Sequence, residues 1–232
     1  MEQVPSDCRE SRGLAAIIRH GIGSINCAER SLLSGTVEVD ETCLGWVGTG
    51  PRGRGAERKA IVVIAAEVRG RGTGRIRMSV TPDVSSVSLN LFISENISKC
   101  SEIKTDGWSG YNGVKKLGYT HSAKTISTNK DPAHITMPRV HHVASLLDRW
   151  WLGIHQGAIR PSHLDYYLDE FTFRFNRRTS KARGLLFYRL MEQAIDCSPV
   201  PRKIIIGGQT QDMVDGWVNW IPTLVISGPI PH

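Results

Sequence analysis

The stretch that most constrains the fold is Gly35–Thr42, in which valines and acids alternate. Successive strand side chains point to opposite faces of a sheet, so Val37 and Val39 share one face. Glu38 and Asp40 share the other. We expect a buried strand that ends by delivering a carboxylate to a sheet edge. Three acids within four residues repel one another unless a divalent metal, a basic side chain or solvent lies among them.

Two further strands are expected next. The run Ala60–Ala66 is continuous and rich in β-branched residues, as in a strand covered on both faces. Arg75–Val80 instead alternates apolar and polar residues, and the turn-rich segment 69–74 joins the two runs. Together with the first strand they predict a three-stranded antiparallel meander.

A helix and two short strands are expected after the meander. Ser85 or Ser86 can cap a helix with apolar residues over 87–93. Glu102–Gly107 predicts a strand that ends in an aspartate, and 118–126 predicts another. If the strands ending in Asp40 and Asp106 meet at one edge, both carboxylates could serve two-metal chemistry, although each aspartate could also simply cap a turn.

Two amphipathic helices are expected in the second half. From Pro138 the apolar residues recur at helical spacing, while His141 and Asp148 fall on another side of the same helix. Both could face one site, or both could be ordinary surface residues. A second helix follows Pro161 and ends in a segment where arginines alternate with aromatic residues, which suits either phosphate contacts or a solvated helix end.

The charge and the cysteine content of the chain indicate which kinds of partner and location to expect. The net charge of +7 and the pI near 9.3 favour an anionic partner such as nucleic acid. Five scattered cysteines without a CxxC pair favour a reducing, cytoplasmic location over a disulfide framework or a zinc site. The sequence contains neither a secretion signal nor eighteen uninterrupted apolar residues, so we expect no membrane association.

Four motifs in order resemble the DDE-type insertion-sequence transposases of the ISXO-like group. They are Val37–Thr42, Lys104–Tyr111, Ser145–Trp150 and Tyr167–Arg178. The resemblance covers about Gly35 to Ala194, and its specificity comes from the joint occurrence of the motifs.

The resemblance implies an α/β fold, an RNase H-like mixed sheet flanked by helices. It implies that Asp40 and Asp106 hold Mg²⁺ or Mn²⁺ in a two-metal arrangement and that His141 is the third ligand, with His142 as the fallback. The activity implied is metal-dependent DNA cleavage and strand transfer of an insertion sequence, and the alternative is an inactive remnant that binds DNA non-specifically. The expected DNA-binding residues are Arg149, Arg174, Arg177, Arg178, Lys181 and Arg183.

The expected organisation is an N-terminal appendage over 1–34, the catalytic domain over 35–195 and a tail over 196–232. The expected partners are the insertion-sequence ends and target DNA, bound by a homo-oligomer. Two departures from the family pattern stand out: the zinc ribbon and recognition helices are missing from the first 34 residues, and Asp148 stands where the family has Lys. An acid at this position would repel phosphate.

Overall fold

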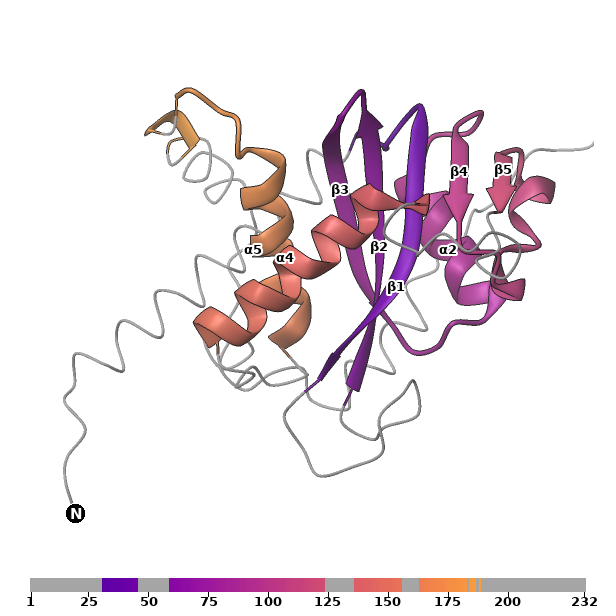
Figure 1. Ribbon diagram of the computed structural model, residues 1–232, viewed down its shortest axis with the longest axis horizontal. Helices are drawn as coiled ribbons and strands as arrows, with labels where there is room; N and C mark the ends of the chain where they lie inside the picture. The colour runs from indigo at the N-terminus through magenta and orange to yellow at the C-terminus, as the bar shows by residue number, and fades with distance from the viewer. Residues whose placement is uncertain are drawn as a thin grey trace, which may run out of the picture.

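The computed structural model describes residues 31–45, 59–123, 136–155, 163–182, 184–186 and 188. These residues form a five-stranded sheet, in the order β3-β2-β1-β4-β5, with helices on both faces (Figure 1). The sheet mixes antiparallel and parallel pairing. The predicted α/β class is confirmed, and the architecture is that of an RNase H-like domain.

The first three strands form the predicted meander. They are β1 (Thr36–Gly45), β2 (Lys59–Arg69) and β3 (Gly72–Thr81), paired antiparallel in sequence order. One expectation was wrong: β1 does not end at Asp40 but continues to Gly45, in the middle of the sheet. The reason is its pairing with β2, which runs without a break from Val37 opposite Glu67 to Gly45 opposite Lys59.

Two short parallel strands extend the sheet on the other side of β1. Strand β4 (Glu102–Thr105) pairs with β1 from Thr36 opposite Glu102 to Glu38 opposite Lys104. Strand β5 (Thr120–Ala123) pairs with β4 and is shorter than the predicted segment 118–126, of which 124–126 lie outside the described residues. The connection between β4 and β5 contains two 3-10 turns, η1 (Ser109–Tyr111) and η2 (Val114–Leu117).

Within the described residues, three α-helices cover the sheet. Helix α2 (Ser86–Asn96) begins at the predicted cap, where Ser85 Oγ accepts the backbone N–H of Ser88 at 3.3 Å. Helix α4 (Pro138–His155) confirms the amphipathic helix predicted from Pro138. Helix α5 (Leu164–Asn176) confirms the second, although Pro161 and Ser162 lie outside the described residues. Among the described helices, none is long and apolar enough to cross a membrane.

The two faces of the sheet bury separate cores. Val37 and Val39 pack with α2 on one face, together with Ile103 and Tyr111. On the other face Val62, Ile64 and other strand residues pack against the apolar sides of α4 and α5. Glu38 and Asp40 alternate with the valines, so their side chains point to the face that α4 covers.

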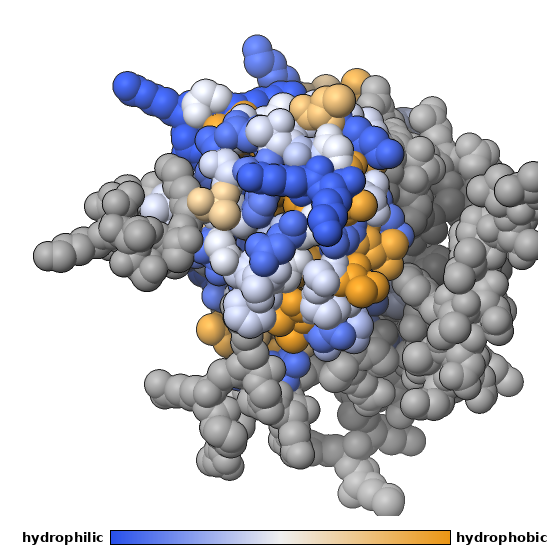
Figure 2. Space-filling view, turned by 90° about the vertical axis from the view of Figure 1, so that its right-hand side faces the viewer, coloured by the Kyte–Doolittle hydropathy of each residue, from blue (hydrophilic) through white to orange (hydrophobic). Residues whose placement is uncertain are grey.

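Both edges of the sheet are protected against pairing with another chain. On β3, Asn176 of α5 takes the place of a neighbouring strand: its Oδ1 accepts the N–H of Ile76 at 2.7 Å, and its Nδ2 donates to the carbonyl of Ile76 at 3.1 Å. At the other edge β5 has only four residues. The surface at that end of the molecule is largely hydrophilic, with small hydrophobic patches (Figure 2).

Candidate active site

Asp40 and His141 meet where α4 crosses β1. His141 Nε2 lies 3.7 Å from Asp40 Oδ2, and the Asp40 side chain is 17% exposed. The other carboxylate oxygen of Asp40, Oδ1, accepts the backbone N–H of Glu41 at 2.9 Å. A carboxylate and an imidazole 101 residues apart in sequence therefore meet beside the sheet, both half-buried.

Asp106 follows β4 at the same level of the sheet. Because Glu38 pairs with Lys104 in parallel register, two further residues along each chain bring Asp40 level with Asp106. Burial is the main cause that raises the pKa of Asp40, and the negative charge of Asp106 raises it further, against the opposing effects of the Glu41 N–H and His141. The two carboxylates are thus close enough to interact.

The loop after β4 is held by local contacts. Asp106 Oδ1 accepts the backbone N–H of Trp108 at 2.9 Å, and Gly107 between them adopts a φ of 87°, which favours glycine. The indole N–H of Trp108 donates to the carbonyl of Val84 at 3.1 Å. A Cβ at Gly110 would lie 2.9 Å from Trp108 and Leu89 atoms, so no larger residue fits there. The Asp-Gly-Trp-Ser-Gly motif therefore fixes the position of Asp106.

A third carboxylate and a tyrosine lie next to this pair. Burial and the negative charges of Glu41, Asp40 and Asp106 raise the pKa of Tyr111 well above its usual value. Tyr111 is fully buried, and the carboxylate oxygens of Glu41 are buried as well. The Tyr111 hydroxyl is therefore a neutral donor beside an acidic cluster.

Glu38 has a different role from Asp40 although both point to the same face. Its Oε2 accepts the backbone N–H groups of Arg139 at 2.7 Å and Val140 at 3.0 Å, and the residue is 4% exposed. These two donors belong to the first turn of α4, where N–H groups lack helical partners and favour a negative charge. Glu38 therefore anchors the start of α4 directly before His141.

The sequence profile of the ISXO2-like transposase domain matches residues 32–176, which is more than half of the chain. This chain belongs to the ISXO2-like transposase family. A comparison with curated proteins gave no match. The matched segment runs from just before β1 to the last residue of α5, so it contains every strand and helix that contributes to the site.

A divalent cation fits the acidic residues of this transposase domain as a partly hydrated ion. Among the described residues, no group of three His, Cys, Asp or Glu side chains is arranged to hold a metal. Mg²⁺, however, usually takes only one or two protein carboxylates and completes its coordination with water and substrate phosphate. Asp40, whose pKa the negative charge of Asp106 helps to raise, would supply that donor set together with Asp106.

The predicted DNA-binding residues of the transposase lie on α4 and around the end of α5. Arg149 is exposed, and Arg174 pairs with Glu170, four residues earlier on α5, at 3.5 Å. The guanidinium groups of Arg177 and Arg178 stack on Phe173 and Phe175, with 4.1 and 3.9 Å to the ring centroids. Lys181 is exposed and Arg183 lies outside the described residues.

Arg178 already uses several of its donors within the protein. It donates to the carbonyl of Phe175 at 2.8 Å, to that of Gly74 at 3.4 Å and to that of Thr73. Burial lowers the pKa of its guanidinium. Arg178 therefore ties the end of α5 to the start of β3, a role that the arginine-rich pattern did not indicate.

Asp148 does not join the acidic site by any described contact. Its side chain is exposed on α4, although neighbouring protein atoms desolvate the carboxyl enough to raise its pKa. The repulsion of phosphate expected at this position stays a prediction.

Sequence reasoning missed the residues that support the site. The Glu38 contacts join segments about 100 residues apart, so no local spacing indicates them. Local spacing also gives no indication of the contact between Thr105 Oγ1 and His121 Nε2, which lie 2.9 Å apart and join β4 to β5. Glu41 and Tyr111 belong to two of the motifs that carry the resemblance, but nothing in the sequence indicates that the two side chains lie next to each other.

Proposed function

We propose that this domain cleaves DNA at the ends of an insertion sequence and joins the freed ends to target DNA, in a reaction that requires divalent metal. Asp40 and Asp106 would hold Mg²⁺ or Mn²⁺, and His141 would be the third ligand. The observation that carries the proposal is the approach of His141 Nε2 to Asp40 Oδ2, at 3.7 Å, on a strand in register with Asp106. Family membership supports it.

The bound metal would supply a Lewis acid that activates the attacking oxygen and stabilises the leaving one. Water would first attack the phosphorus atom and break the P–O bond to the transposon 3′ oxygen, which leaves as a hydroxyl. That hydroxyl would then attack a phosphodiester of target DNA and displace its 3′ oxygen. The protein's own part is to keep Asp40 and Asp106 together, to hold His141 over them and to present arginines to the backbone. A homo-oligomer on DNA would bring two ends together.

A test is nicking and strand transfer by the full chain on supercoiled DNA carrying candidate ends, with Mn²⁺, Mg²⁺ or EDTA. The proposal expects metal-dependent products that disappear in Asp40→Asn and Asp106→Asn. Glu95→Ala, an exposed acid on α2, is the matched control and should retain activity. Equal product from wild type and both aspartate variants would refute the assignment of these residues.

The second candidate is an inactive remnant that binds DNA without chemistry. What favours it is that no three-residue metal group is present among the described residues and that Asp148 replaces a basic residue. It predicts DNA binding that weakens steeply with salt and is indifferent to metal and to the substitution of Asp40 or Asp106.

A further inference from the structure

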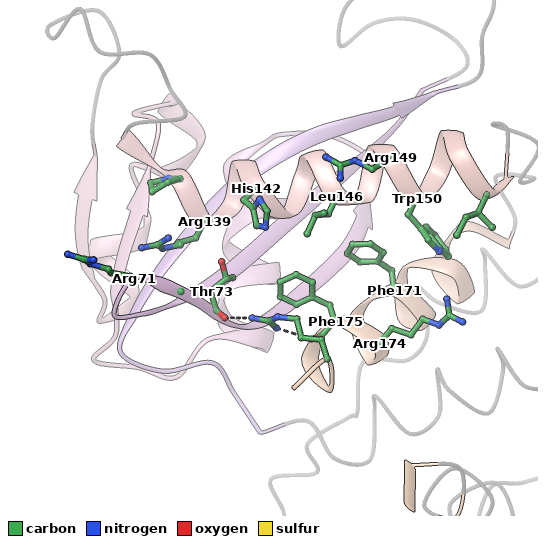
Figure 3. Close-up of a pocket in the computed structure, with 14 residues that line it drawn as sticks. Arg71, Thr73, Arg139, His142, Leu146, Arg149, Trp150, Phe171, Arg174 and Phe175 are labelled. Atoms are coloured by element: carbon green, nitrogen blue, oxygen red, sulfur yellow. Dashed lines mark hydrogen bonds between the residues drawn. The ribbon is translucent and has the colours of Figure 1, made fainter. Parts of the chain in front are cut away.

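We propose that a pocket on a different flank of α4 from the one that faces Asp40 binds an unpaired nucleotide of single-stranded DNA. The pocket lies between α4, α5 and the β2–β3 turn and has a volume of about 960 Å³ (Figure 3). This inference rests on the proposed DNA-processing function, because cleavage creates free strand ends that can separate from the duplex.

The pocket is separate from the acidic site. Its α4 residues include Arg139, His142, Leu146 and Arg149, which follow one another at steps of three or four and so share one side of the helix. His141 is one position away from His142, about 100° around the helix, and contacts Asp40 of β1. Helix α4 therefore carries the pocket on one flank and the acidic site on another.

Charge favours an anionic ligand. Five arginines line the pocket and no Asp or Glu does; the arginines are Arg71, Arg139, Arg149, Arg174 and Arg178. Arg71 and Arg149 make no ion pair within the part of the chain that the structure describes. Arg139 is half-buried and donates from Nη2 to the carbonyl of Gly70 at 3.2 Å, so its guanidinium is held at the pocket wall.

The floor of the pocket favours a base over a bare phosphate. Trp150, Phe171 and Phe175 line it, with Trp150 and Phe171 ring centroids 5.5 Å apart. Phe171 and Phe175 are buried and Phe175 already carries the Arg178 guanidinium, so the half-buried Trp150 is the ring on which a base would stack. Figure 3 shows these rings between the arginines of α4 and α5. A nucleotide presents both a flat aromatic surface and an anion, which is the combination that single-strand binding sites use.

A duplex fits the pocket less well. Its bases are stacked inside the helix, so the aromatic floor would face only sugar and phosphate. The volume is in the range of pockets that enclose a small molecule, which suits one unpaired nucleotide. An intact duplex would contact only the arginine rim.

The experiment measures binding of the full chain to a labelled oligothymidylate and to a duplex of equal length, by fluorescence anisotropy in EDTA so that no cleavage occurs. We expect tighter binding of the single strand. Trp150→Leu should weaken it by about 5- to 150-fold, the usual contribution of one stacked base. Arg71→Ala and Arg149→Ala should each reduce the slope of log affinity against log salt by about 0.7.

Lys116→Ala is the matched control, because it removes an exposed cation from η2, outside the pocket, and it should leave single-strand affinity unchanged. Circular dichroism of each variant separates lost binding from lost folding. If Arg71→Ala and Arg149→Ala fold and bind the oligonucleotide like wild type, the inference is wrong. It is also wrong if these variants melt at a lower temperature but bind the oligonucleotide like wild type. That result would mean that the two arginines stabilise the fold by contacts within the protein and do not bind DNA.

The outcome is independent of the nicking assay. Single-strand binding that depends on the pocket, without metal-dependent nicking, would refute the proposed activity and leave the pocket assigned. Nicking without a pocket-dependent preference for single strands would support the proposed activity and refute the pocket assignment.

Discussion

Glu38 and Val140 are joined by a hydrogen bond of 3.0 Å between a buried carboxylate and a backbone N–H in the first turn of α4. The neighbouring N–H of Arg139 donates to the same oxygen. His141 follows directly, so the distance between His141 and Asp40 depends on how Glu38 holds the helix start.

Glu38→Ala should therefore destabilise the fold and reduce activity together. It leaves two buried N–H donors without their acceptor, at a cost of about 2 kcal/mol or more. Glu38→Gln keeps an acceptor oxygen and should cost less than about 1 kcal/mol. Urea denaturation measures both, with Glu95→Ala expected within about 0.5 kcal/mol of wild type. A Glu38→Ala protein as stable as wild type would show that the contact is not structural.

Asp40→Asn should stabilise the protein at neutral pH while it removes metal-dependent nicking. Burial raises the pKa of Asp40, so the folded state binds its proton more tightly than the unfolded chain, and stability falls as pH rises through that raised pKa. Asparagine does not carry this charge and keeps the Oδ1 acceptor for Glu41. The expected gain at pH 7 is about 0.5–2 kcal/mol, and it should shrink toward pH 4. Thermal melts of both proteins at several pH values test this. An Asn variant less stable than wild type at pH 7 would contradict it.

Metal affinity should fall as the pH is lowered. The fall should begin at a higher pH than it would for a ligand aspartate with an ordinary pKa. A cation binds the carboxylate and must displace the proton that the raised pKa of Asp40 retains. Calorimetric titration with Mn²⁺ between pH 5 and pH 8 should show affinity rising with pH, together with proton release into the buffer. A pH-independent affinity would argue against Asp40 as a ligand.

His141→Glu should change metal preference. A carboxylate is a harder ligand than imidazole, so the variant should gain activity with Mg²⁺ relative to Mn²⁺. His141→Ala should lower activity with both metals by more than about 100-fold if the ligand contributes several kcal/mol to the reaction. Nicking rates at saturating metal provide the comparison. The same Mg²⁺ to Mn²⁺ ratio in His141→Glu and wild type would remove His141 from the ligand set.

Asn176→Ala should destabilise the sheet at its β3 edge. The change removes two hydrogen bonds to Ile76, at a cost of about 1–3 kcal/mol. Lys181→Ala, at an exposed position nearby in sequence, should stay within about 0.5 kcal/mol of wild type. Denaturation midpoints of the two variants measure the difference, and equal midpoints would show that Asn176 does not support the edge.

Local patterns in the sequence were enough to predict the elements but not their neighbours. The alternation at Arg75–Val80 and the cap at Ser85 depend on residues close in sequence, and both are confirmed. The central position of β1 depends on β4 pairing beside it in parallel, across more than 60 residues, and alternation cannot reveal such a partner. The wrong end of β1 has the same origin, because its last residues are held by β2.

In the candidate site, too, the residues could be predicted from the sequence but their arrangement could not. The aspartates came from motifs and His141 from the family resemblance, whereas their positions relative to one another depend on the register of β1 with β4 and on Glu38. The pocket was not predicted, because Arg71, Arg139 and Phe171 come from three segments whose packing no single segment encodes.

The parallel pairing of β1 with β4 spans three residue pairs, whereas its antiparallel pairing with β2 spans nine. Asp40 and Asp106 consequently belong to parts of the sheet with different resistance to local opening. Amide hydrogens of β4 should exchange with deuterium sooner than those of β2, and a cation held by both aspartates would slow the exchange in β4. Metal binding would then have a second effect besides supporting the reaction, since it would also stabilise the short pairing between β1 and β4.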